Sequence, residues 1–218
     1  MLEYKNLELG GCYHQAPMSY PALLSWCEKK AEQFAPYITD TGNYIAAALS
    51  NHQKVVLEAQ LGAMRDIDYG IFPYTSSSST ISAYGPIGAG IPGTLPDHIV
   101  GVLKAYSTCV GAGPFTAEKA MPEKWMESLR KSGGEYGAAT GRPRRVGPFD
   151  AVASAYGLKC QNADKIALTK LDVLSHMDEI PVITSYKLND EIITEFDPLD
   201  DLDSMTPVIL SLIHISEP

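Results

Sequence analysis

The sequence is poor in positive charge and has no long apolar run. It carries 17 Lys and Arg residues against 26 Asp and Glu residues, a formal net charge of −9 over 218 residues. This acidic balance argues against a surface built for nucleic acid or an anionic membrane, but it leaves room for a small anion site. No apolar stretch reaches the roughly 18 residues of a membrane span, and the polar segment MLEYKNLELGG is not typical of a signal peptide.

Cysteine is also scarce. The four cysteines are widely spaced, with no CxxC pair and no Cys/His spacing typical of a metal site. We therefore expect no zinc site and a reduced, cytoplasmic setting. Asp66 and Asp68 lie two residues apart in RDIDYG, so on a strand they would share a face and could bind a metal. Roles in a turn or a cap are the favoured interpretation, and no metal site is predicted.

Apolar periodicity and turn residues predict alternating helices and strands. Ser19 can cap a helix over residues 19–34, with Pro21 in its first turn. The Ser/Gly/Pro-rich stretch 76–94 is expected to be an ordered loop, and Gly157 to end a helix that begins near residue 150. Further elements are a short helix over 45–49, a buried strand over 54–57, and strands within 98–110 and over 166–168 and 182–186. The end TPVILSLIHISEP indicates a truncated chain or a few residues of foreign sequence at the tip, and the alternative is a terminal strand with a frayed end. The pattern predicts an α/β fold with a largely parallel sheet flanked by helices.

The stretch GEYGAATGRPRRVG, residues 134–147, concentrates the scarce positive charge. Three of the five arginines, Arg142, Arg144 and Arg145, fall within four residues of a glycine-rich loop. The planar guanidinium donates paired hydrogen bonds to carboxylate or phosphate, so the loop favours an anionic ligand. Because a residue before proline is extended, Arg142 and Arg144 should point to one side and Arg145 to the other, toward an acidic neighbour or solvent. The alternative is a generic basic patch to which all three contribute alike.

The tetrapeptide TKLD, residues 169–172, follows the apolar run IAL and is predicted to lie at the exit of a strand. Ligands bind at that edge of α/β sheets. The carboxylate of Asp172 could accept hydrogen bonds from N1–H and the exocyclic amine of guanine, a donor pair that adenine lacks. The stem of Lys170 could lie along the base. The alternative is an exposed turn.

Four stretches together resemble adenylosuccinate synthetase across roughly residues 53–187: LEAQLGAMRDIDYGIFPYTSSSST, KAYSTCVGAGPFTAE, GEYGAATGRPRRVGPFDAVA and ALTKLDVL. The resemblance implies a truncated P-loop-NTPase-like synthetase fold. It comprises a helical lead-in over 1–52, a nucleotide- and aspartate-binding core over 53–187 and an incomplete C-terminal part over 188–218. It implies GTP-dependent ligation of IMP and L-aspartate to adenylosuccinate in AMP biosynthesis, in a cytoplasmic homodimer.

The resemblance also implies binding residues. IMP would be bound by Gln60, Ser76, Val110, Gly111 and Arg142; aspartate by Ala138, Ala139, Thr140, Gly141, Arg142, Pro143 and Arg144; and GTP by Arg144, Lys170, Leu171 and Asp172. Gln60 stands one residue before the family's glutamine position, which Leu61 occupies, and is expected to fill that role through a local shift. Ala139 replaces a common threonine of the aspartate loop.

The family's GDEGKGK loop, which carries the catalytic base and binds Mg²⁺, does not occur in these 218 residues, and neither does a GxxxxGK[ST] motif. No catalytic residue is therefore assigned here, and the chain alone is expected to be inactive. Mg²⁺ is expected only with that missing segment. One alternative is a non-catalytic guanine-nucleotide-binding module. An RNA-phosphate binder using GRPRR is disfavoured by the acidic composition.

Overall fold

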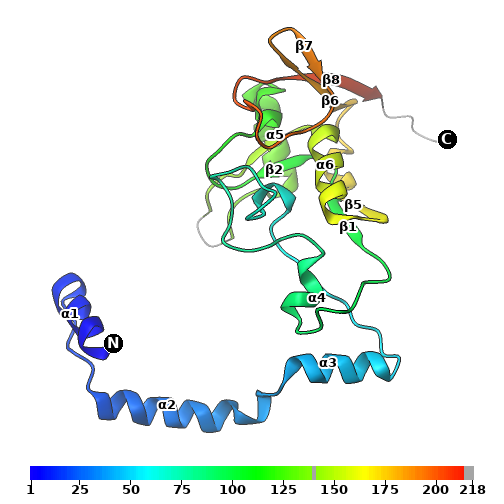
Figure 1. The fold of residues 1–218 in the computed structure, drawn as a ribbon. Helices are drawn as coiled ribbons and strands as arrows, with labels where there is room; N and C mark the ends of the chain where they lie inside the picture. The colour runs from blue at the N-terminus through cyan, green and yellow to red at the C-terminus, as the bar shows by residue number, and fades with distance from the viewer. Residues whose placement is uncertain (139–140, 214–218) are drawn as a thin grey trace. The chain divides into compact units, whose positions relative to one another are not determined.

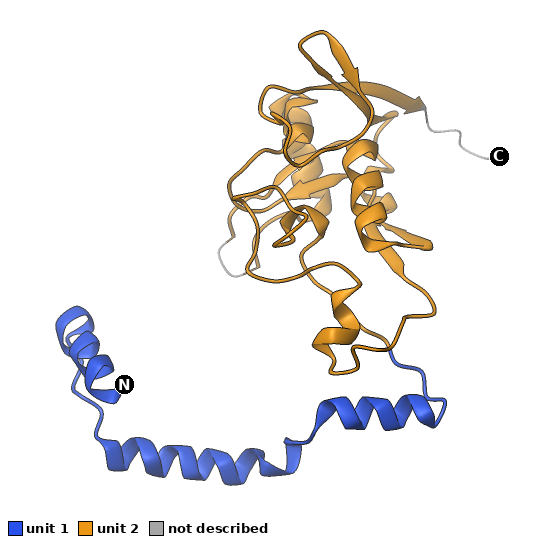
Figure 2. Ribbon diagram, in the orientation of Figure 1, with its two compact units in different colours: residues 1–55 blue, residues 56–218 orange. Residues whose placement is uncertain are grey.

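The computed structural model describes residues 1–138 and 141–213, so the predicted aspartate contacts Ala139 and Thr140 lie outside the described residues. The chain divides into two compact units, residues 1–55 and 56–218 (Figure 2). The domain boundaries expected from the sequence, after residues 52 and 187, stay predictions.

The first unit consists of helices with no buried residue in any α-helix. In chain order they are α1 (Leu2–Tyr13), α2 (Tyr20–Phe34), the short helix η1 (Ala35–Tyr37) and α3 (Thr41–Ser50). The helix over 19–34 is confirmed, with the Ser19 hydroxyl accepting the N–H of Ala22 and Pro21 in the first turn. The helix over 45–49 is also confirmed as part of α3, which Asp40 caps through the N–H of Asn43.

The second unit contains the strands, and it confirms the α/β class. The parallel pairs are β1 (Val100–Lys104) with β5 (Lys165–Thr169), and β4 (Phe149–Asp150) with β6 (Glu179–Leu188). Antiparallel pairs join β2 (Ser107–Cys109) to β3 (Arg145–Gly147), and β6 to both β7 (Glu191–Ile193) and β8 (Thr206–Ile213). β8 comprises the segment TPVILSLI.

The second unit also contains helices. They are η2 (Ala63–Arg65), α4 (Tyr84–Gly88), η3 (Thr116–Lys119), α5 (Glu123–Gly133), α6 (Ala151–Gln161) and η4 (Leu171–Leu174). α5 contacts β3 and η4, whereas α6 contacts β1 and β6 (Figure 1). α4 lies inside the stretch 76–94, where Thr80 and Ile91 are buried, so the expectation of an ordered loop is confirmed.

Two sequence expectations are wrong. Residues 54–57 do not form a strand, and Val56 is 89% exposed. A β-branched run becomes a strand only where another strand pairs with it, and no such pairing is found among the described residues. Gly157 does not end α6, which continues to a left-handed Asn162. A glycine inside a helix costs only about 1 kcal/mol, and the bare backbone of Gly157 faces Ala63.

Two apolar clusters hold the second unit together. One joins the connection between β1 and β2 to α5, β3 and η4 through residues such as Tyr106, Leu129, Val146 and Leu174. The other joins η3, α6 and β6 through residues including Ala117, Val152, Ile183 and Tyr186. Asp150 caps α6 through the N–H of Ala153 and accepts the Tyr186 hydroxyl at 2.7 Å. The clusters fix the ends of β1, β2, β3 and β5 relative to one another, and the candidate site lies at those ends.

Candidate functional site

A cavity of about 760 Å³, the main cavity, opens in the second unit. Its wall comes from η2, the turn 74–76, the ends of β1 and β2, and the start of α6. Of the IMP contacts expected from the sequence, Ser76 and Val110 line it, and Arg144 lines it too. These residues are far apart in the sequence, and the fold brings them to one cavity.

Leu61, and not Gln60, stands at the cavity wall where the resemblance implies a glutamine. Gln60 is exposed, and among the described residues it is Leu61, with a left-handed φ of 68°, that lines the main cavity. Gly111 follows Val110 with a φ of 85°, and its carbonyl accepts a hydrogen bond from Arg145 at 3.3 Å. Gln60 is not among the residues that line the main cavity, so the role expected for it through a local shift stays a prediction.

Arg65 ties two walls of the main cavity together. Its guanidinium donates to the carbonyls of Val110 and Ala112 at 3.1 Å each, and to the carbonyl of Tyr74. Its own carbonyl accepts the N–H of Ser76 at 2.8 Å. Sequence reasoning missed Arg65, although one of only five arginines inside the RDIDYG stretch was an available signal.

Asp66 organises the adjoining turn, which confirms the favoured interpretation. It is fully buried and accepts the backbone N–H groups of Thr80, Asp68 and Tyr69 at 2.6, 2.9 and 3.0 Å. Burial raises the pKa of Asp66, but these hydrogen bonds outweigh it and hold the pKa below its ordinary value. Within the described ranges no three His, Cys, Asp or Glu side chains gather as metal ligands.

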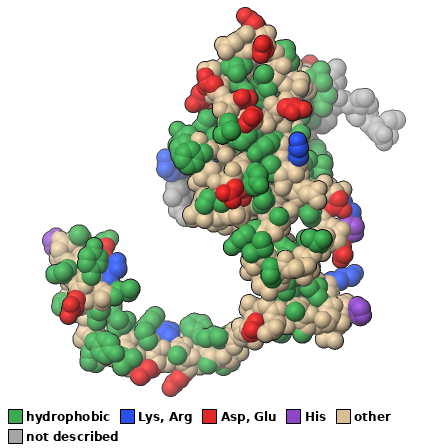
Figure 3. Space-filling view, viewed as in Figure 1, with side chains coloured by type: hydrophobic (Ala, Val, Ile, Leu, Met, Phe, Trp, Pro, Cys, Tyr) green, Lys and Arg blue, Asp and Glu red, His purple; other side chains and the backbone are tan. Residues whose placement is uncertain are grey.

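Arg145 of the 134–147 stretch turns to an acidic neighbour. Arg145 forms a two-pronged ion pair with Glu118, donates to the carbonyl of Gly113 at 2.7 Å, and lies 5.4 Å from the centroid of the Phe115 ring. The prediction that Arg145 turns to an acidic neighbour is confirmed. On the face that Figure 3 shows, acidic side chains are scattered among apolar ones and few basic side chains are visible.

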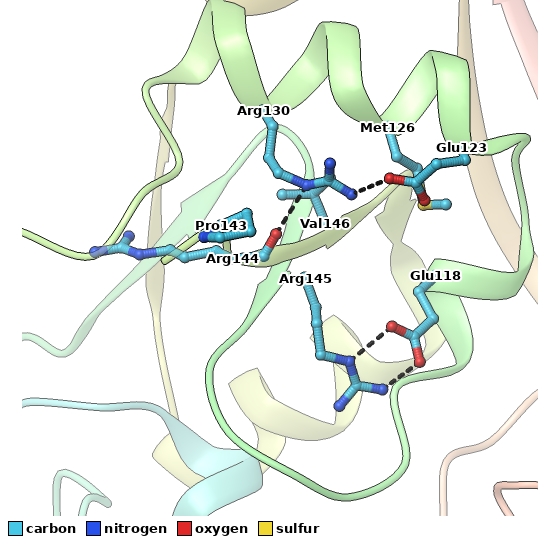
Figure 4. Close-up of a pocket in the computed structure, with 8 residues that line it drawn as sticks. All are labelled: Glu118, Glu123, Met126, Arg130, Pro143, Arg144, Arg145 and Val146. Carbon is cyan, nitrogen blue, oxygen red and sulfur yellow. Dashed lines mark hydrogen bonds and ion pairs between the residues drawn. The ribbon is translucent and has the colours of Figure 1, made fainter. Parts of the chain in front are cut away.

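A smaller pocket of about 430 Å³, the side pocket, lies against Arg145 (Figure 4). Figure 4 shows Arg145 meeting Glu118, and Arg130 meeting both Glu123 and the carbonyl of Arg144. The positive charges of Arg130 and Arg145 are thus matched by carboxylates there. Pro143 also lines the side pocket, and among the described residues only Arg144 lines both hollows.

Arg144 is held by a buried carboxylate. Its Nη1 lies 3.0 Å from Oε2 of Glu135, which is 2% exposed. Oε1 of the same carboxylate accepts Lys104 Nζ at 2.7 Å and the Tyr106 hydroxyl at 2.6 Å. Burial raises the pKa of Glu135, but the hydrogen bonds and positive charges of these partners lower it by more. The pKa of Glu135 therefore lies below its ordinary value. Glu135 and Lys104 were missed by sequence reasoning, although Glu135 is the one acidic residue in GEYGAATGRPRRVG.

Hydrogen bonds join described residues on the two sides of this stretch. Gly137 N–H donates to the carbonyl of Arg142 at 2.8 Å, and Tyr136 forms a β-bridge with Pro143. Gly141, with a φ of 64°, donates back to the carbonyl of Gly137, and Ala138 is exposed in the turn between them. The aspartate contacts expected from the sequence therefore lie together on one exposed turn, as far as they are described.

TKLD lies at a strand exit, as predicted. β5 ends at Thr169, Lys170 has a left-handed φ of 64°, and Leu171 and Asp172 are exposed at the start of η4. Lys170 Nζ donates to the carbonyl of Gly133 at 3.3 Å, two residues before Glu135. The predicted guanine-binding residues thus contact the end of α5, where the arginine-rich stretch begins.

These features define an α/β protein with a cationic cavity wall at strand ends and an exposed carboxylate at a neighbouring strand exit. The sequence model of the adenylosuccinate synthetase family matches residues 1–214, and the chain belongs to that family, whose members are ligases of purine biosynthesis. Along the described helices, none combines the length and apolar character needed to cross a membrane.

Individual relatives agree. The chain is 39% identical to adenylosuccinate synthetase from Carboxydothermus hydrogenoformans over 99% of its own length and 50% of the relative's. It is 41% identical to the Sorangium cellulosum enzyme, covering 93% of this chain and 47% of that one. The solved structure of fully ligated adenylosuccinate synthetase from Plasmodium falciparum is similar with a TM-score of 0.80 and 30% identity, over 96% of this chain and 51% of that one. The chain spans about half the length of the curated relatives it matches.

Proposed function

We propose that this chain supplies the binding residues for IMP, L-aspartate and the guanine of GTP in an adenylosuccinate synthetase. In that enzyme GTP drives the ligation of IMP and aspartate. The observation that carries the proposal is the main cavity, whose wall brings together Ser76, Val110 and Arg144. Lys104, which also lines the cavity, pairs with Thr169 at the end of β5, directly before Lys170. Family membership supports the ligase reading and does not favour a non-catalytic module.

Each side chain suits its proposed role. Arg142 and Arg144 can bind the carboxylate of aspartate or a phosphate, because a guanidinium forms paired, charge-assisted hydrogen bonds. The hydroxyl of Ser76 is half-buried at the cavity wall and can bind the nucleotide IMP. Gly111 keeps the backbone after Val110 bare, so a base can approach it closely. Mg²⁺ and the homodimer belong to the proposed whole enzyme, and no residue described here is assigned to the metal.

Asp172 is proposed to select guanine, and its substitution tests the function. Asp172→Asn should weaken binding of GDP to the chain by roughly 1–3 kcal/mol, because an amide cannot accept both guanine donors. The same variant should gain affinity for xanthosine diphosphate, whose 2-oxygen can accept the new amide N–H. Isothermal titration calorimetry with both nucleotides measures the change in preference.

The matched control is Asp178→Asn, since Asp178 is also an exposed aspartate a few residues downstream. It should leave both affinities unchanged. An Asp172→Asn variant that still prefers GDP as strongly as the unaltered chain would refute the assignment.

A further inference from the structure

Glu135 is buried and accepts hydrogen bonds from several partners, and the proposed binding roles do not explain why. A carboxylate that is 2% exposed accepts three donors from two segments far apart in the sequence: Lys104 at the end of β1 with Tyr106 just after it, and Arg144 just before β3. We propose that Glu135 is the positioning residue of the main cavity's cationic wall, holding Lys104 and Arg144 where they meet an anionic ligand. The proposal deepens the proposed function and rests on it.

The geometry assigns one cation to each carboxylate oxygen. Lys104 Nζ lies 2.7 Å from Oε1, and Arg144 Nη1 lies 3.0 Å from Oε2. Both cations line the main cavity, and their side chains keep 29% and 36% exposure. A single buried anion between two partly exposed cations leaves the wall with a net positive charge, which suits a phosphate or carboxylate. Without that anion the two cations would repel each other and swing toward solvent.

Glu135 is itself rigidly held. Its N–H donates to the carbonyl of Arg130 at the end of α5, and its carbonyl accepts the N–H of Arg144, each at 2.9 Å. The Tyr106 hydroxyl, which donates to its Oε1, packs closely against Gly133, since a Cβ on that glycine would come within 2.5 Å of the phenol oxygen. A side chain fixed by backbone and phenol can set the direction of longer, more flexible partners.

The chain contains a matched control for this arrangement. Glu118 and Arg145 also form a glutamate–arginine pair, and Arg145, the first residue of β3, directly follows Arg144. That pair lines the side pocket, whereas the Glu135 partners line the main cavity. Glu118→Gln therefore removes an arginine-paired carboxylate in a pair whose two members do not line the main cavity.

The binding test uses the full 218-residue chain and titration calorimetry with IMP. Glu135→Gln should weaken IMP binding about tenfold, and Glu118→Gln should change it less than about twofold. In an Arg144→Gln background, Glu135→Gln should add less than about a twofold further loss, because a residue that acts through Arg144 has nothing left to position. A full, additive loss in the double variant would show a merely structural role and overturn the proposal.

A ligand-free measurement separates this proposal from the proposed function. The arginine reagent phenylglyoxal is applied to the unliganded chain, and modification of each arginine is followed by peptide mass spectrometry. Glu135→Gln should speed modification of Arg144 severalfold and leave Arg145 unchanged, whereas Glu118→Gln should do the reverse. Failure of the unaltered chain to bind IMP would refute the proposed function, and the modification rates would still decide the role of Glu135.

A second variant covers the case in which Glu135→Gln does not fold. Glu135→Asp keeps the charge but draws it back by one methylene, so Arg144 reactivity should rise at least about twofold while that of Arg145 stays constant. Unchanged Arg144 reactivity in a folded Glu135 variant, or equal increases at Arg144 and Arg145, would overturn the positioning role.

Discussion

At the scale of single residues, the buried carboxylates decide the local architecture. Asp66 and Glu135 are almost fully buried and each satisfies three or more donors, so each fixes a loop next to the main cavity. Removing one partner of such a network leaves buried donors without acceptors, which costs more than the hydrogen bonds themselves contribute.

Asp66 gives a pH-dependent prediction. Because its pKa is lowered in the folded chain, its stabilising contribution is fully present above the unfolded value of about 3.9 and is lost as the pH falls through the lower folded value. Asp66→Asn should lower the free energy of unfolding at neutral pH by roughly 1–3 kcal/mol and flatten the acid limb of the stability curve. Urea unfolding at a series of pH values from neutral to acid measures both effects.

Asp68→Asn is the control for that experiment, because Asp68 is exposed two residues away. It should change the free energy of unfolding by less than about 0.5 kcal/mol. An acid limb that is equally steep with and without the Asp66 carboxylate would contradict the turn-forming role.

Residue chemistry was partly predictable from the sequence. The arrangement of Pro143 between two arginines predicted that Arg145 would diverge toward an acidic neighbour, and Glu118 is that neighbour. The partner itself could not be predicted, because it comes from η3, 27 residues earlier in the chain. Glu135 and Arg65 were missed for the same reason: their importance lies in contacts with distant segments, and only the folded chain brings these together.

At the scale of elements, local sequence patterns correctly predicted some helices and strands. A serine cap and an early proline predicted α2, and a short apolar run before a polar turn predicted β5. The strand predicted over 54–57 does not form, because strand formation depends on a pairing strand that the sequence alone does not reveal. The prediction that Gly157 ends the helix was wrong, because packing of α6 against η2 and β6 overrides the weak helix preference of glycine.

Contact between β3 and η3 gives an element-scale prediction. A Cβ at Gly147 would lie 2.3 Å from the carbonyl oxygen and 2.5 Å from the carbonyl carbon of Ala117, both of which are backbone atoms. Gly147→Ala should therefore force β3 away from η3 and lower the free energy of unfolding by about 1–3 kcal/mol. Thermal and denaturant unfolding measure the loss.

Gly93→Ala is the comparison, because nothing lies within 4 Å of a Cβ at Gly93. Gly93→Ala should leave the free energy of unfolding almost unchanged. Equal stability of the two alanine variants would show that β3 and η3 are not packed as closely as described.

At the scale of the whole molecule, the chain matches about half the length of its curated relatives, and its proposed role is ligand binding. We expect the 218 residues assayed by themselves to form no adenylosuccinate from IMP, GTP, Mg²⁺ and aspartate, because no catalytic acid or base is assigned among them. Loss of catalytic groups costs several orders of magnitude in rate. The absorbance change on conversion of IMP measures this, and turnover near that of a full-length relative would contradict it.

The central claim is that the main cavity binds IMP while the strand exit at 170–172 binds guanine. Amide hydrogen exchange of the chain, followed with IMP, with GDP and with neither, tests it most directly, because a bound ligand protects the backbone that it contacts. IMP should slow exchange in residues 74–78, 108–113 and 142–145, and GDP should slow it in residues 170–174. Protection by IMP confined to other segments, or none at saturating nucleotide, would contradict the account.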